Sequence, residues 1–266
     1  MKPPPCVLTI AGSDSGAGAG VQADSRTIQA LGGYACTAIT AVTAQNTRGI
    51  IAWRPVPTTL LVTQIAAVLD DFPIAAIKTG LLPGAAAVRA VVSTLAGRPK
   101  IALVVDPVIG STSGTRFLSP TGARALLREL LPLATLVTPN WPEAELLTGL
   151  RVRTFAEAES AARRLLAMGC RAVLVKGGHS PGRVCRDCLV LADEQHAVWF
   201  ESPRIKTRNT HGTGCVLSAA IALGFARGDS VEAAIARARR FLISGLAAGR
   251  GVVFGAGAGP AFGVMP

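Results

Sequence analysis

Short apolar runs alternate with longer segments of helical period along most of the chain, and this alternation limits the folds that it can adopt. Uninterrupted apolar runs such as IALVV at 101–105 are typical of strands buried on both faces. Strands that alternate with amphipathic helices indicate an α/β fold with a mostly parallel central sheet and helices on both faces. The predicted strands are 6–11, 34–42, 74–78, 101–105, 134–138 and 172–176, and the predicted helices are 19–31, 58–70, 83–96, 119–131, 155–169, 214–227 and 230–249.

The segment 187–202, DCLVLADEQHAVWFES, predicts an antiparallel hairpin near one edge of this sheet. Cys185 and Cys188 form a CxxC pair at its start. A structural zinc site needs a second pair of ligands, and only His196 lies nearby in the sequence. A thioredoxin-like site needs its CxxC at a strand-to-helix turn, so we interpret these cysteines as incidental loop thiols.

The chain has 266 residues, half of them hydrophobic, and no stretch has the composition of a linker, a low-complexity tract or a repeat. We therefore expect one domain over residues 1–266. The N-terminal apolar run is too short for a signal peptide, and no uncharged apolar run reaches the about 18 residues needed to cross a bilayer. These features predict a cytoplasmic protein with no membrane partner.

The formal net charge of +11 raises the question of nucleic-acid binding. The basic residues are scattered, however, and no basic stripe alternates with aromatic residues, which make up only 5% of the chain. We therefore predict no nucleic-acid partner, and a basic surface that attracts anionic metabolites.

Ligands bind beyond the carboxyl ends of parallel strands, and the first such position carries the glycine-rich segment AGSDSGAGAGVQAD at 11–24. It matches the loose dinucleotide pattern GxGxxA, but the acidic residue expected about 20 positions later is absent. The chain also has no Walker-type GxxxxGK[ST] motif. The loop instead lets a ligand approach the backbone closely. Of its two aspartates, Asp14 and Asp24, one would cap the helix and the other would face a ligand.

Polar side chains also follow three later strands. Asp106, in DPV, either caps a turn or faces the ligand crevice, and its position favours the crevice. Asn140 and Glu143, in TPNWPE, are three apart where a helix begins. They would hold Mg²⁺ through its waters or form a capping box, and this segment alone favours capping. Lys176, in VLVKGGH, either binds a nucleotide phosphate or is solvated.

Residues 208–225, RNTHGTGCVLSAAIALGF, change from a polar to an apolar helical pattern at Cys215. Gly212 and Gly214 leave backbone N–H groups free at a helix N-terminus, where the helix dipole favours an anion such as phosphate. The thiol is a redox centre, a small buried residue or a working group. Because it lies in the first helical turn, we expect its thiolate to be favoured, and we assign it a working role beside the anion.

These residues together supply the parts of phosphoryl transfer to the hydroxyl of a small molecule. Oxidoreduction lacks its cofactor motif in this chain, and hydrolysis lacks a nucleophile elbow.

Six segments resemble, in the same order, those of the hydroxymethylpyrimidine/phosphomethylpyrimidine kinases of thiamine biosynthesis. They are AGSDSGAGAGVQAD, TAVTAQNT, DPV, TPNWPEAELL, VLVKGGH and NTHGTGC. The combination of QAD, AQNT and THGTGC is specific, although each alone is not. The resemblance implies a ribokinase-like fold, a homodimer, and a reaction that uses Mg²⁺ and ATP. The substrate would be 4-amino-5-hydroxymethyl-2-methylpyrimidine, which is converted to its monophosphate and then to the diphosphate.

The resemblance also implies roles for individual residues. The pyrimidine would be bound by Gly12, Asp24, Gln45, Leu81 and Val108, with Gln45 on the aminopyrimidine edge and the two apolar side chains on the ring faces. ATP would be bound by Asn140, Lys176, Thr207 and Asn209, and Mg²⁺ by Asp106 and Glu143. The catalytic residues would be Cys215, as general base, and Gly212, Thr213 and Gly214 at the anion hole.

The chain departs from the family pattern at four places. Leu81 stands where a methionine commonly packs on the ring, SGAGAG replaces SSGGAG, and GHGHGP is replaced by GAGAGP. Ser111 and Thr112 stand where some members have Ala-Lys, which removes a phosphate contact. These differences favour the first phosphorylation over the second.

The hydroxymethyl group must lose a proton as it attacks, whereas a phosphomonoester, with a second pKa of about 6, is already largely ionised at neutral pH. We therefore expect Cys215 to matter chiefly for the first phosphorylation. The alternative activity is that of a pyridoxal or pyridoxine kinase of the same fold. Gln45 favours the aminopyrimidine because an amide pairs with a ring nitrogen and its exocyclic amine together. A nucleic-acid-binding regulator and a thiol redox sensor built on Cys185 and Cys188 are the alternatives outside this class.

Overall fold

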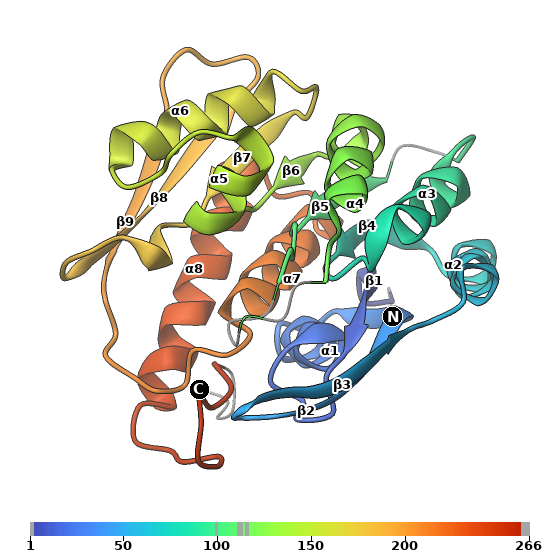
Figure 1. Ribbon diagram of the computed structural model, residues 1–266, viewed down its shortest axis with the longest axis horizontal. Helices are drawn as coiled ribbons and strands as arrows, with labels where there is room; N and C mark the ends of the chain where they lie inside the picture. Colours follow the sequence, from blue (N-terminus) through green and yellow to red (C-terminus); the bar gives the residue numbers. More distant parts are fainter. Residues whose placement is uncertain (1–2, 99–100, 111–113, 115–116, 262–266) are drawn as a thin grey trace.

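The computed structural model describes residues 3–98, 101–110, 114 and 117–261. Its centre is a nine-stranded sheet in the order β3-β2-β1-β4-β5-β6-β7-β8-β9 (Figure 1). The six strands from β2 to β7 in that order are parallel, whereas β3 at one edge and β8 and β9 at the other pair antiparallel. The predicted parallel sheet and its edge hairpin are therefore confirmed.

The bounds of the elements follow the predicted alternation. The strands are β1 (Cys6–Ser13), β2 (Tyr34–Asn46), β3 (Gly49–Pro55), β4 (Ile74–Thr79), β5 (Ala102–Val105), β6 (Leu136–Val137), β7 (Ala172–Val175), β8 (Val184–Leu191) and β9 (Val198–Pro203). The α-helices are α1 (Gly20–Ala30), α2 (Thr58–Asp71), α3 (Gly84–Leu95), α4 (Pro120–Ala125), α5 (Trp141–Thr148), α6 (Phe155–Leu166), α7 (Thr213–Ala226) and α8 (Val231–Ala248).

Two helical layers cover the sheet because successive residues of its strands point to opposite faces. Leu8 of β1 packs with the layer of α2 to α6, whereas its neighbour Val7 packs with α1, α7 and α8. In β5, Val105 packs with the layer of α2 to α6, and its neighbour Val104 packs with α1, α7 and α8. Both faces are thus buried, as the uninterrupted apolar runs predict. Among the described helices, not one combines the length and the hydropathy that crossing a bilayer requires.

Three elements differ from the predictions. Strand β2 continues to Asn46, and the antiparallel edge strand β3 was not predicted, since GIIAWRP contains a glycine and a proline and is largely exposed. The predicted helix 119–131 is α4 followed by a π-helical turn at Leu126–Leu130 and a 3₁₀ turn at Leu131–Leu133. Pro132 lacks the N–H that would continue regular α-helical hydrogen bonding there. Ser111 and Thr112, where the chain departs from the family pattern, lie outside the described residues.

Candidate active site

A cavity of about 480 Å³ lies at the carboxyl ends of the parallel strands, where the sequence predicts the ligand. Its walls come from the ends of β1, β2 and β4, the loops after β5 and β7, and the N-terminus of α7. Twelve of the fifteen residues predicted to act at the site line the cavity, and only Asp24, Thr207 and Asn209 lie outside it. The twelve are Gly12, Gln45, Leu81, Asp106, Val108, Asn140, Glu143, Lys176, Gly212, Thr213, Gly214 and Cys215.

The anion hole forms where two glycine-containing turns meet. Gly212 precedes α7 with a φ of 81°, in the left-handed region, and a side chain there would collide with the carbonyl oxygen of Gly18. Gly214 faces Lys176, since a Cβ atom at this glycine would lie 3.1 Å from Lys176 Nζ. The first turn of α7 therefore presents free N–H groups close to a lysine, and both favour an anion.

Cys215 lies half-buried in the same turn. The sequence predicts that its thiolate is favoured, but the surroundings of the thiol favour the protonated form. Burial raises the pKa of Cys215 to about 11, and the Asp24 and Asp106 carboxylates add to this rise. The Lys78 ammonium and a hydrogen bond from the Gly20 backbone oppose it without reversing it. The expectation of a favoured thiolate is thus wrong for the unliganded chain, because desolvation outweighs the helix N-terminus.

Lys176 and two carboxylates line another part of the cavity. Lys176 Nζ lies 2.6 Å from Asp106 Oδ1 and 3.9 Å from Glu143 Oε2. Burial alone would lower the pKa of Lys176, but both carboxylates raise it, so the ammonium stays charged. Burial raises the pKa of Glu143 to about 7, with Asp106 adding to the rise and Lys176 opposing it. This lysine is therefore paired, and the alternative of a solvated side chain is wrong.

Asn140 and Glu143 form the capping box of α5 and also line the cavity. Asn140 Oδ1 accepts a hydrogen bond from the Glu143 backbone N–H at 2.9 Å, and Glu143 Oε2 accepts one from the Asn140 N–H at 2.7 Å. The two predicted roles are therefore compatible, since the cap holds the carboxylate beside the cavity.

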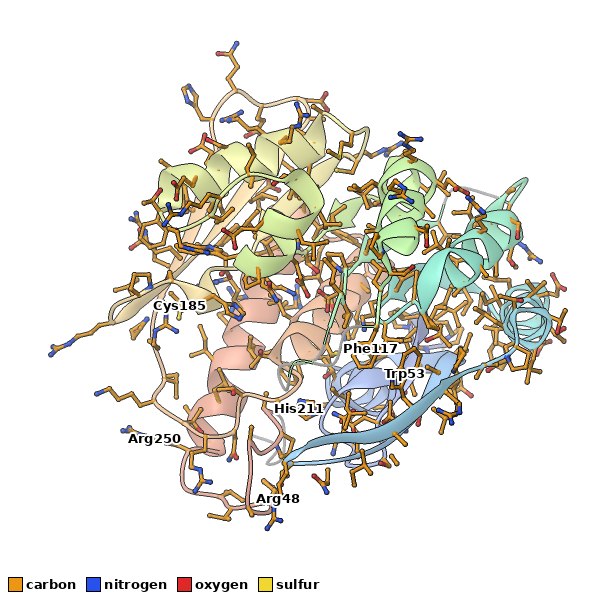
Figure 2. All side chains as sticks on the ribbon, in the orientation of Figure 1. Arg48, Trp53, Phe117, Cys185, His211 and Arg250 are labelled. Atoms are coloured by element: carbon orange, nitrogen blue, oxygen red, sulfur yellow. The ribbon has the colours of Figure 1, made fainter. Side chains whose placement is uncertain are left out.

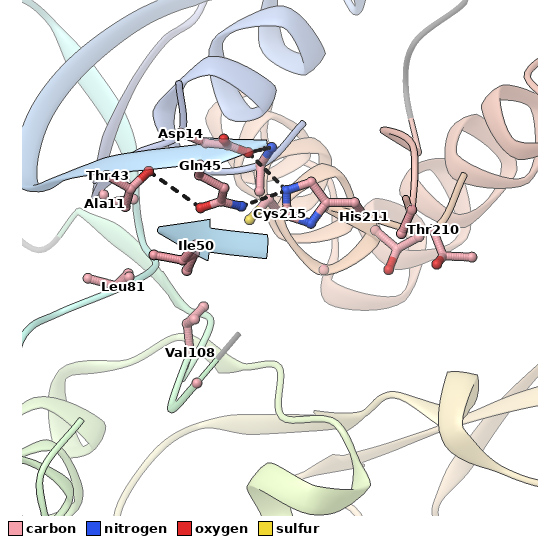
Figure 3. A pocket seen from close by; sticks show the side chains of 18 of the residues that line it. Ala11, Asp14, Thr43, Gln45, Ile50, Leu81, Val108, Thr210, His211 and Cys215 are labelled. Carbon is pink, nitrogen blue, oxygen red and sulfur yellow. Dashed lines mark hydrogen bonds and ion pairs between the residues drawn. The ribbon is translucent and has the colours of Figure 1, made fainter. Parts of the chain in front are cut away.

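An apolar wall faces Gln45 across the cavity. Leu81 packs in a small cluster with Ala41 and Phe117, and Val108 packs against it. The rings of Trp53 and Phe117 meet edge to face, with centroids 5.5 Å apart, and Phe117 also lines the cavity (Figure 2). A flat ring would fit between the apolar side chains, with its polar edge toward Gln45 (Figure 3).

Three predicted contacts need correction. Asp24 is completely buried and pairs with Lys78, so it does not face a substrate. Asn209 is also buried, and its Nδ2 donates to the carbonyl oxygens of Gly249 and Val252, so the carboxamide holds the C-terminal segment instead of ATP. Thr207 lies outside the cavity, and its Oγ1 accepts a hydrogen bond from the Asn209 backbone N–H.

The sequence analysis missed two residues at the site, His211 and Lys78. The His211 ring contacts Gln45 and Asp14, the aspartate that organises the glycine-rich loop and lines the cavity. Lys78, at the end of β4, lines the cavity although its side chain has no exposed surface. The signal for Lys78 was a lysine that ends the apolar run IAAIK, which is unusual for a buried strand. Nothing local pairs Asp14 with a histidine almost two hundred residues later.

Cys185 and Cys188 take no part in the cavity. Both lie on β8, three residues apart, so their side chains point to opposite faces of the sheet, and Cys188 is buried in the core. Figure 2 shows Cys185 far from His211. Among the residues that the structure describes, no cluster of three or more histidine, cysteine or acidic side chains is arranged to hold a metal ion.

Comparison with known proteins identifies relatives of this chain. A family model described as phosphomethylpyrimidine kinase matches residues 14–261. A hydroxymethylpyrimidine/phosphomethylpyrimidine kinase of Haemophilus influenzae is 43% identical, over 90% of each chain. The crystal structure of phosphomethylpyrimidine kinase from Clostridium difficile has a TM-score of 0.78 at 36% identity, covering 90% of this chain and 98% of that one. The crystal structure of an ADP complex of Bacillus subtilis pyridoxal kinase has a TM-score of 0.85 at 34% identity, and the match covers 91% of this chain and 92% of that one.

Proposed function

The chain belongs to the phosphomethylpyrimidine kinase family, and from this premise we propose that it uses ATP to phosphorylate 4-amino-5-hydroxymethyl-2-methylpyrimidine, and then the monophosphate, in a single ribokinase-like domain. One observation carries the proposal. A single cavity is lined by an amide and two apolar side chains, by a lysine with two carboxylates beside it, and by a cysteine at a helix N-terminus. Such a cavity suits a flat polar ring, a nucleotide phosphate and an acceptor for one proton.

In the first reaction the hydroxymethyl oxygen of the pyrimidine attacks the γ-phosphorus of ATP. The bond from that phosphorus to the β,γ-bridging oxygen breaks, ADP leaves, and the hydroxyl proton passes to Cys215 Sγ in its thiolate form. The N–H groups of Gly212 to Gly214 and the Lys176 ammonium stabilise the negative charge on the transferring group. In the second reaction the acceptor is a phosphate oxygen that is already ionised, so no base is required.

The residues present fit a magnesium ion carried by ATP. Magnesium prefers oxygen ligands, and proteins often bind it through one or two carboxylates together with substrate phosphates. Asp106 and Glu143 supply two carboxylates beside Lys176, and either would hold the ion directly or through its waters. When bound, the ion neutralises negative charge on the phosphates.

A pyridoxal kinase activity is the second candidate, since the fold matches that of Bacillus subtilis pyridoxal kinase closely. Gln45 favours the pyrimidine kinase activity over the pyridoxal kinase activity. Its amide pairs with a ring nitrogen and an adjacent exocyclic amine, a combination that pyridoxal lacks. The test supplies the pyrimidine alcohol, pyridoxal and pyridoxine separately with Mg-ATP and identifies the products by mass spectrometry. Mono- and diphosphates of the pyrimidine are expected, and efficient phosphorylation of the pyridines alone would contradict the proposal.

The homodimer and the cytoplasmic location stay predictions. Analytical ultracentrifugation at several protein concentrations tests the first, with twice the mass of the 27.2 kDa chain as the expected result.

A further inference from the structure

Asp14, His211 and Gln45 form a chain of contacts along one wall of the cavity (Figure 3). His211 Nε2 lies 2.9 Å from Asp14 Oδ2 and 3.0 Å from the carboxamide of Gln45, at Nε2. Both contacts meet the same ring nitrogen, which carries at most one proton. The position of that proton therefore decides how Gln45 faces a ligand.

Asp14 fixes the proton on this nitrogen. Its buried carboxylate accepts hydrogen bonds from the backbone N–H groups of Gly16, Gly18 and Ala19. Burial acts to raise the pKa of Asp14, but the His211 ring and the N–H groups of Gly16 and Ala19 together lower it below its usual value. An ionised carboxylate only accepts hydrogen bonds, so His211 Nε2 carries the proton and donates it to Asp14.

A protonated ring nitrogen has no lone pair with which to accept the amide N–H of Gln45. The oxygen and nitrogen of a carboxamide exchange places when the group turns by 180°, and the hydrogen-bond network decides between the two arrangements. With the oxygen toward His211, the Nε2–H is shared between Asp14 and Gln45 as a three-centre bond.

The other end of the carboxamide supports the same arrangement. It lies 3.4 Å from Thr43 Oγ1, and this hydroxyl donates its own proton to the Ser13 carbonyl oxygen at 2.9 Å. Thr43 Oγ1 therefore has lone pairs to offer to the amide NH₂ of Gln45. Each group in the series Asp14, His211, Gln45, Thr43 and the Ser13 carbonyl then has a hydrogen-bond partner, and no donor faces a donor.

We propose that the Asp14–His211 pair determines specificity by holding the Gln45 carboxamide with its oxygen toward α7 and its NH₂ toward Thr43, which sets the way round in which the pyrimidine ring binds. This inference rests on the proposed function. The amide NH₂ donates to ring nitrogen N3, and the amide oxygen accepts from the 4-amino group.

Because of the order of the substituents on the pyrimidine ring, the orientation of the Gln45 amide decides where the reacting hydroxyl group lies. The hydroxymethyl group at C5 is next to the 4-amino group, so it lies on the amide-oxygen side of Gln45. Figure 3 draws the carboxamide with its nitrogen toward His211, and it shows His211 and Cys215 on one side of Gln45 and Thr43 on the other. Once the amide is turned as proposed, the side of His211 and Cys215 is the amide-oxygen side. The opposite amide orientation would turn the ring over and carry the reacting hydroxyl away from Cys215. His211 is thus a positioning residue that acts through Gln45.

The proton on His211 is tested directly by ¹⁵N NMR of the histidine side chains. The chain has three histidines, so the His211→Phe and His196→Phe variants assign the signals. We expect a protonated Nε2 in His211, whether the ring is neutral or charged. An unprotonated Nε2 would overturn the proposal.

The effect on the ligand is tested by calorimetric binding of the pyrimidine alcohol and of its analogue without the 4-amino group. We expect the wild-type chain to bind the amino compound with about tenfold or higher affinity than the analogue, since the analogue lacks one well-placed hydrogen bond. His211→Phe should reduce this preference to less than threefold, His211→Gln should restore part of it by supplying an N–H donor, and the exposed His196→Phe control should keep it.

Weaker binding of both compounds by His211→Phe, with the preference intact, would show a merely structural role and overturn the proposal. If the wild-type chain bound neither pyrimidine, the proposed function would fail. The NMR result would still report on the Asp14–His211–Gln45 arrangement, so the two failures are distinguishable.

Discussion

Lys78 Nζ lies 2.7 Å from Asp24 Oδ2, and neither side chain has any exposed surface. The pair joins β4 to α1 directly beneath the cavity, and Thr9 donates a further hydrogen bond to the same carboxylate oxygen. Burial alone would raise the pKa of Asp24 and lower that of Lys78, and each partner opposes this effect on the other. Each charge therefore depends on its partner.

The first prediction concerns this pair. Lys78→Met leaves an uncompensated buried carboxylate, and we expect the free energy of unfolding at pH 8 to fall by about 3–5 kcal/mol, measured by urea denaturation. The double variant Lys78→Met/Asp24→Leu removes both charges and should recover most of this loss. A double variant that is as unstable as the sum of the two single variants would contradict this account.

The second prediction concerns Glu143. Its pKa of about 7 lies above its ordinary value of 4.5, so the folded state holds a proton that the unfolded state has lost between these pH values. Its contribution to stability is complete below about pH 4.5 and is lost as the pH rises through 7. Glu143→Gln, which cannot ionise, should therefore gain about 1–3 kcal/mol relative to the wild-type chain between pH 5 and pH 8. A difference between the two proteins that does not change with pH would argue against this shift.

The third prediction concerns Cys215. With a pKa of about 11, its thiolate fraction rises roughly tenfold per pH unit between pH 7 and pH 9. Single-turnover phosphorylation of the pyrimidine alcohol should rise accordingly, while Cys215→Ala should be slow and independent of pH over this range. Cys215→Ser is the matched control, because it keeps a side chain of similar size that does not ionise. In Cys215→Ala, the rate of phosphorylation of the monophosphate should fall much less than the rate of phosphorylation of the alcohol. Equal losses of rate in the two reactions would rule out Cys215 as the base.

The fourth prediction concerns Gly212, which has a φ of 81°. A methyl group there would meet the Gly18 carbonyl oxygen and push α7 away from the glycine-rich loop. Gly212→Ala should lower kcat/KM by about 100-fold or more, since small displacements of catalytic groups have effects of that size. Gly228→Ala is the control: this glycine also has a positive φ, of 86°, but no atom lies within 4 Å of its added carbon. It should lose about 1–2 kcal/mol of stability and keep its activity. Similar kinetics in the two variants would refute the collision.

The sequence predicts the sheet and most of the cavity because both depend on local pattern. A polar residue that ends a buried apolar run, such as Asp106 or Lys176, must lie at the carboxyl edge of a parallel sheet, and so these residues converge. Strand β3 was not predicted because it is an exposed edge strand. Such a strand does not require the apolar run from which the other strands were predicted. Asp24 and Asn209 were misassigned because motif position does not tell a buried partner from a ligand contact.

The ionisation of Cys215 was also mispredicted, for a different reason. Sequence places the thiol at a helix N-terminus, which lowers its pKa, but only the packed structure shows how much water the site excludes. The contact of His211 with Asp14 depends on how two distant loops fold against each other, so no local pattern indicates it.

The C-terminal segment crosses from one side of the cavity to the other. The backbone of His211 accepts a hydrogen bond from Ala261 N–H and donates one to the Gly259 carbonyl oxygen, while Gly257 N–H donates to Thr47 Oγ1. Gly257 and Ala258 line the cavity themselves. A nascent chain therefore cannot complete this wall until residue 261 has left the ribosome, long after Gly12 on the opposite part of the lining has done so.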